Sequence, residues 1–61
     1  MATPLEIRER QKQCLIGLLK IKRANAGYTV LGLQEEIESA VGVMEQEDVA
    51  YVEKVLGVKA L

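Results

Sequence analysis

Residues 14–21 (CLIGLLKI) limit what this chain can fold into, because as a helix they are apolar around most of their circumference. At about 100° per residue, their apolar side chains occupy an arc of about 220°. A surface helix that covers a single core usually has an apolar stripe a little more than about 100° wide. Since one partner helix cannot cover the wider arc, the segment predicts a helix with neighbours on two sides.

The length of the chain predicts one small domain that needs help to stay folded. The chain has 61 residues, one Cys and no His. A domain of about 60 residues buries only about 60% of its unfolded surface, and many such domains rely on disulfides, a metal or oligomerisation. A single Cys without His excludes an internal disulfide and a His/Cys zinc site. We therefore expect no cofactor and no metal, but a homo-oligomer, most simply a dimer.

The first residues and the hydropathy of the chain predict a cytoplasmic protein. Residues 1–4 lead directly into charged residues, which is unlike a secretion signal. No apolar run approaches the about 20 residues of a membrane helix, so we expect no membrane partner. A lone thiol without an export signal is typical of the cytosol.

The first helix is predicted over residues 4–25. Thr3 fits the N-cap, Pro4 the first helical position and Glu6 the returning partner of a capping box. Residues 26–29 are predicted to form the turn that follows.

Within that turn, Gly27 fits the left-handed position just beyond a helix end. Thr29 is predicted to cap the next helix.

The second half of the chain determines the fold, and two interpretations fit it. Its apolar stripe keeps one helical phase from Val30 to Val55, which favours one long helix over residues 30–56 that ends at a left-handed Gly57. The alternative is two helices, over residues 30–41 and 45–56, split at Gly42. The predicted fold class is therefore all-α: an antiparallel two-helix hairpin, with a third helix if it breaks near Gly42, that assembles into a helical bundle.

Asp48 is the one charged residue on the apolar stripe of the second half. In an antiparallel hairpin that closes near Gly27, Asp48 lies opposite Ile7 and Arg8, and Arg8 or Lys12 is expected to pair with it. The alternative is that Asp48 lies at an exposed end of the bundle.

The two halves of the chain carry opposite charge. Residues 1–29 have six cations against two acids, a net charge of +4, and residues 30–61 have two cations against seven acids, a net charge of −5. Such asymmetry can indicate a nucleic-acid-binding arm. The simpler interpretation, which we favour, is that the halves pair with each other, within or between chains.

This sequence contains few side chains that could carry out catalysis. The absence of His removes the usual general base. Cys14, the strongest potential nucleophile, sits at the most apolar point of the chain, where a buried thiol behaves as a small hydrophobe. The adjacent carboxylates Glu35 and Glu36 point about 100° apart on a helix and fit a solvated acidic face. We expect no enzyme.

The remaining class is a non-enzymatic protein that self-associates and acts by protein–protein binding. An inhibitor or regulator of a larger complex, for example a phage-borne anti-defence protein, belongs to this class. The residues expected at the self-association surface are Cys14, Leu15, Ile16, Leu18, Leu19, Ile37, Val41 and Met44. The residues expected to set partner choice are Arg8, Arg10, Lys12, Lys20, Lys22 and Arg23.

The alternative function is nucleic-acid binding through the same six cations of the first helix, which would contact phosphate. The acidic character of the later segments opposes this alternative, because they would repel a phosphate backbone.

Overall fold

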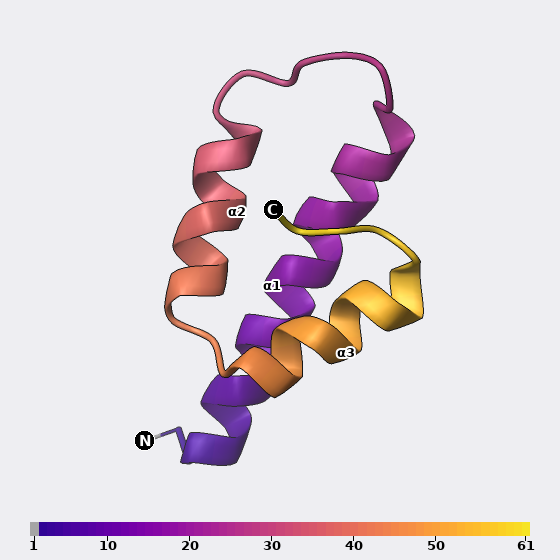
Figure 1. The fold of residues 1–61 in the computed structure, drawn as a ribbon. Coiled ribbons are helices and arrows are strands. Elements are labelled where there is room, and N and C mark those ends of the chain that lie inside the picture. Colours follow the sequence, from indigo (N-terminus) through magenta and orange to yellow (C-terminus); the bar gives the residue numbers. More distant parts are fainter. Residues whose placement is uncertain (1) are drawn as a thin grey trace.

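The computed structural model describes residues 2–61, and within them the chain forms three helices (Figure 1). Helix α1 spans Pro4–Ala24, α2 spans Leu33–Gly42 and α3 spans Gln46–Leu56. These described residues contain no strand. The predicted all-α class is confirmed.

Helix α1 begins as its sequence predicts. Thr3 is the N-cap, and its hydroxyl accepts a hydrogen bond from the backbone N–H of Glu6 at 3.2 Å. This is one of the two bonds of the predicted capping box. The helix ends at Ala24, one residue before the predicted end.

The loop after α1 is longer than predicted. Gly27 has the expected positive φ, +89°. Thr29 does not cap the next helix, however, because α2 begins only after Gly32. Gly32 takes the N-cap position with φ +78°, a conformation that costs glycine little, and makes no side-chain cap bond.

The long helix predicted over residues 30–56 is wrong, and the two-helix alternative is confirmed. Helix α2 ends at Gly42, and the next two N–H groups bond three residues back, from Val43 to Ala40 O and from Met44 to Val41 O. Glu45 is extended and begins α3. The sequence pattern misled because the buried faces of the two helices overlap in helical phase, although Tyr51 and Val55, at the edge of the predicted stripe, are exposed on α3.

The break reverses the direction of the chain. Helix α2 runs antiparallel to α1, whereas α3 runs back across α1 with its first turn near Arg8 and its last carbonyl near Arg23 (Figure 1). Both later helices pack on α1. The two neighbours that residues 14–21 require are therefore α2 and α3 of the same chain.

The core lies where the three helices meet. The side chains of Leu15, Leu19, Ile37 and Val52 are fully buried there. Leu15 and Leu19, which were expected at the self-association surface, are therefore enclosed by a single chain instead. The physical reason is the break after Gly42, which lets one chain cover α1 from two directions.

The last residues close the gap between the diverging ends of α2 and α3 (Figure 1). Gly57 caps α3 with φ +67°, as predicted. Ala60 is 1% exposed, and its backbone is bonded to all three helices. Its N–H donates to Glu53 Oε2 at 2.7 Å, and its carbonyl accepts from Gln34 Nε2 at 3.5 Å and from Lys22 Nζ at 3.4 Å.

Candidate protein-binding site

One flank of α1 keeps a row of side chains at the surface of the chain. The row follows the spacing 4-3-4-3, and we call it the open stripe: Ile7, Gln11, Cys14, Leu18 and Ile21. Ile7 is 46% exposed and Ile21 is 45% exposed. Cys14 is exposed, and Gln11 and Leu18 are half-buried. Alternating steps of four and three residues are the spacing of a helix–helix seam.

The open stripe borders a groove between α1 and α2 with a volume of about 620 Å³. Cys14 and Leu18 line it from α1. The α2 side contributes the carboxylates of Glu35 and Glu36, which we call the acidic wall, together with Ser39 and Ala40. The groove thus offers an apolar floor beside negative charge.

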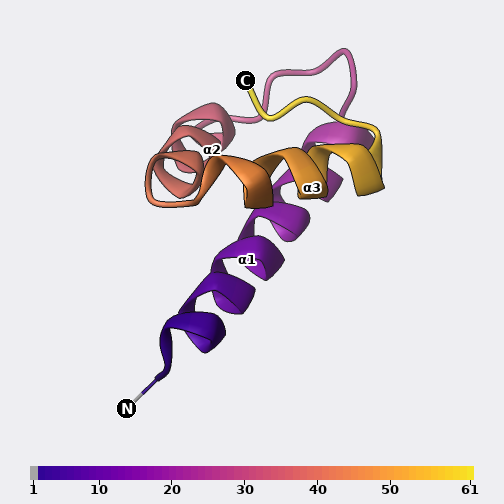
Figure 2. The ribbon, with the colours of Figure 1, turned by 60° about the horizontal axis from the view of Figure 1, so that its bottom comes forward.

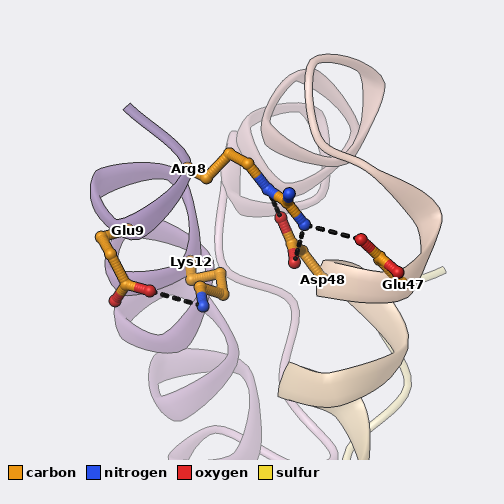
Figure 3. A network of polar contacts seen from close by, with 5 residues as sticks. All are labelled: Arg8, Glu9, Lys12, Glu47 and Asp48. Atoms are coloured by element: carbon orange, nitrogen blue, oxygen red, sulfur yellow. Dashed lines mark hydrogen bonds and ion pairs between the residues drawn. The ribbon is translucent and has the colours of Figure 1, made fainter. Parts of the chain in front are cut away.

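The opposite flank of α1 contacts α3 through polar side chains, and Arg8 makes three hydrogen bonds there (Figure 3). Arg8 Nε donates to Asp48 Oδ2 at 3.0 Å, and Nη2 donates to Asp48 Oδ1 at 2.9 Å and to Glu47 Oε1 at 2.7 Å. Asp48 is 6% exposed. The predicted pairing of Asp48 with Arg8 is therefore confirmed, and the exposed-end alternative is wrong.

This pairing shifts the titration of both partners. The hydrogen bonds from Arg8 lower the pKa of Asp48 below its ordinary value of 3.8, against the opposing effect of burial. The bonds to Asp48 and then to Glu47 raise the pKa of Arg8. Bidentate, charge-assisted bonds of this kind are stronger than neutral hydrogen bonds, so this contact fixes the first turn of α3 on α1.

Three more cations of α1 have partners within the chain. Lys12 pairs with Glu9 at 2.6 Å (Figure 3), which raises the pKa of Lys12. Its Nζ also lies 5.6 Å from the ring centroid of Tyr51. Arg23 Nη1 donates to the carbonyl of Leu56 at 3.1 Å. The third, Lys22, donates from Nζ to the carbonyl of Lys59 at 2.9 Å.

The structure therefore divides the six predicted partner-binding cations into two groups. Arg8, Lys12, Lys22 and Arg23 make polar contacts within the chain, the last two with carbonyls at or beyond the end of α3. Among residues 2–61, the side chains of Arg10 and Lys20 take part in no ion pair or hydrogen bond. The nucleic-acid alternative stays a prediction, and of the six cations named for it only Arg10 and Lys20 have no such contact among residues 2–61.

The eight residues predicted at a self-association surface also divide. Leu15, Leu19, Ile37 and Met44 lie in the core of one chain, so a second copy cannot reach them in this fold. Three are half-buried and pack against that core: Ile16, Leu18 and Val41. Cys14, expected to be a buried hydrophobe, is exposed in a single chain. The surface available to a partner is thus the open stripe.

Sequence reasoning missed the outer members of this site. Neither Ile7 nor Ile21 is among the residues named for the self-association surface, although Ile21 ends the apolar segment of residues 14–21. The 4-3-4-3 spacing was the signal that could have found both. The contribution of Glu35 and Glu36 had no such signal, because it depends on where α2 packs.

The described residues offer little else in the way of a site. Within residues 2–61, no group of three or more His, Cys, Asp or Glu side chains could hold a metal ion. No helix in the described range has both the length and the apolar character needed to cross a membrane. No protein-family model matches the chain, and neither the curated proteins nor the solved structures include a significant match to it.

Proposed function

We propose that this chain is a non-enzymatic protein that self-associates and acts by protein–protein binding, with the open stripe and the neighbouring groove as its contact surface. The proposal includes an inhibitor or regulator of a larger complex, for example a phage-borne anti-defence protein. Such proteins commonly act by laying a helix face against a partner.

One observation carries the proposal: the open stripe stays at the surface of a chain that encloses its neighbouring leucines completely. Leu15 and Leu19 follow Cys14 and Leu18 by one residue each and are fully buried, whereas Ile7 and Ile21 are each almost half exposed. Single exposed apolar residues are ordinary on protein surfaces. Apolar residues repeated at seam spacing along four turns favour a helical partner.

The test changes the open stripe without touching the core. Ile7→Lys and Ile21→Lys introduce charge at positions that are already exposed to solvent, so the fold of a single chain should survive. Far-UV circular dichroism checks that it does. The matched control is Val55→Lys, because Val55 is 58% exposed but lies on α3. Substitution of Leu15 or Leu19 would be unsuitable, since it would destabilise the core of the single chain.

Size-exclusion chromatography with light scattering supplies the measurement. The wild type and Val55→Lys should form a species larger than 6.7 kDa whose fraction grows with concentration, and the two open-stripe variants should remain at 6.7 kDa. The same mass for all four proteins at every concentration would overturn self-association through this surface. If a partner protein captured by the wild type is lost with Val55→Lys as much as with the open-stripe variants, target binding lies on another surface.

A further inference from the structure

We infer that the groove between α1 and α2 receives α1 of a second copy, running antiparallel, with the two-fold axis close to Cys14. This inference rests on the proposed function and specifies its geometry: an isologous pair in which the open stripe of one copy covers that of the other.

The spacing of the open stripe makes it self-complementary in the antiparallel direction. Cys14 lies at its centre, with Ile7 seven residues before it and Ile21 seven residues after it. A two-fold axis near Cys14 therefore places Ile7 of one copy beside Ile21 of the other. The seam from Ile7 to Ile21 is about 21 Å long at 1.5 Å per residue. Isologous pairing of this kind is the commonest way for a small protein to form a closed oligomer.

The shape of the chain leaves room for this partner. The N-terminal turns of α1 project beyond both other helices (Figure 2). In an antiparallel pair, the projecting turns of each copy would lie in the groove of the other, beside Leu18 and α2. The groove of each copy thus covers the part of the other copy's α1 that the other copy's α2 leaves bare.

Charge selects the antiparallel direction over the parallel one. Arg10 lies four residues before Cys14, so an antiparallel partner brings it to the level of Leu18, four residues after Cys14. The acidic wall, Glu35 and Glu36, lines the same groove as Leu18. Among residues 2–61 the side chain of Arg10 has no ionic partner of its own. A parallel pair would instead place Arg10 beside Arg10 and leave the acidic wall unpaired.

The size of the seam indicates a weak dimer. A standard protein–protein interface buries about 800 Å² per partner, roughly a sixth of the 4579 Å² of accessible surface of this chain. The seam has only five positions, and one of them is the polar Gln11, which costs stability. The measurements should therefore extend from about 1 µM to about 1 mM protein.

The first part of the experiment tests whether the Cys14 thiols of the two copies lie close together. A short homobifunctional maleimide should cross-link wild-type chains efficiently through Cys14, the only cysteine. The matched control carries Cys14→Ser together with Lys54→Cys, which moves the thiol to the exposed side of α3. This control should form the same light-scattering species but cross-link poorly.

The second part is a charge exchange between copies. Arg10→Glu and Glu36→Arg should each raise the dissociation constant of the dimer about tenfold, because each places two like-charge contacts across the two-fold axis. An equimolar mixture of the two variants should regain wild-type affinity, since the heterodimer pairs opposite charges at both contacts. Lys20→Glu, an equal charge change on the far side of α1, should have little effect.

The outcomes separate this inference from the proposed function. A concentration-dependent dimer with efficient Cys14 cross-linking and rescue by mixing supports both. A dimer that is dissociated by Ile7→Lys, but lacks cross-linking and is insensitive to Arg10→Glu, overturns the antiparallel pairing and leaves the proposed function standing. A chain that stays monomeric up to about 1 mM overturns both.

Discussion

The two flanks of α1 are covered by helices of nearly equal length, yet they are built differently. The flank toward α3 is held by polar contacts that cross from helix to helix, with Arg8 on Asp48 at one end and Arg23 on Leu56 at the other. On the flank toward α2, residues 2–61 show one side-chain bond from α1, from Gln11 Nε2 to the carbonyl of Val43, the C-cap residue of α2, at 3.3 Å. Along the rest of that flank, apolar side chains face an open groove.

The difference separates two roles within one helix. On the α3 flank, charged side chains hold a short helix and the tail in place. They can do so because bonds to buried carboxylates and helix-end carbonyls are directional. The α2 flank contributes apolar surface, which is non-directional and can be shared with another molecule. The predictions below test this division, beginning with the largest expected effect.

The largest effect is expected from a comparison of Leu19, in the core, with Ile21, two residues later in the open stripe. Leu19→Ala removes a fully buried side chain and should lower the free energy of unfolding by about 3 kcal/mol. A chain of 61 residues is stable by only about 3–9 kcal/mol, so this loss removes a third or more of its stability. Ile21→Ala should cost about 1 kcal/mol in a dilute sample, because its side chain is already 45% exposed.

Urea denaturation followed by circular dichroism measures both values, with the slope checked for constancy. Equal costs at the lowest usable concentration would show that the open stripe is enclosed within a single chain, and the division between core and open stripe would be wrong.

The next effect concerns the tail that ties the two flanks together. Ala60→Glu forces a carboxylate into a site that is 1% exposed and adjacent to Glu53, so it should cost about 2 kcal/mol or more. Leu61→Glu, one residue later and 70% exposed, should change stability by less than about 0.5 kcal/mol. Thermal unfolding of the two variants provides the measurement, and similar melting temperatures would mean that the tail does not close the core.

A smaller effect is expected from the ion pair on the α3 flank, and it depends on pH. Because the folded-state pKa of Asp48 lies below its ordinary value of 3.8, its ionised form stabilises the fold. This contribution is complete well above pH 3.8 and is lost as the pH falls through the lower folded-state pKa. Asp48→Asn should therefore lower the urea midpoint at pH 7 and flatten its fall below about pH 4.

Glu47→Gln is the control for this pair, because the Glu47 side chain is 76% exposed and shares only one of the bonds to Arg8. It should change the midpoint less and keep the acid dependence. An unchanged acid limb in Asp48→Asn would show that other carboxylates control acid unfolding.

Much of the fold could be predicted from local sequence signals. Thr3, Gly27 and Gly57 mark helix ends whose backbone conformation the residue type itself favours, and each lies where expected. The width of the apolar arc of residues 14–21 correctly required two neighbours. These signals succeed because each depends on a few adjacent residues.

What could not be predicted depends on where the chain turns in space. The apolar spacing of the second half fits a straight helix nearly as well as two helices that both face α1, so it could not reveal the break after Gly42. The burial of Leu15 and Leu19 within one chain was missed for the same reason. The acidic wall and the burial of Ala60 follow from that break, and no local sequence pattern predicts either one.

The smallest effect expected is on nucleic acid, and it tests whether the polar flank is really occupied. Binding through all six cations of α1 would give a slope of about −5 for the logarithm of affinity against the logarithm of salt concentration on duplex DNA. Binding through Arg10 and Lys20 alone would give about −2 and a correspondingly low affinity. We expect the weaker behaviour, measured by fluorescence anisotropy of a labelled duplex, because Arg8, Lys12, Lys22 and Arg23 would have to give up contacts within the chain. A slope near −5 would mean that phosphate outcompetes those contacts, and the flank toward α3 would then be the binding surface instead of the one toward α2.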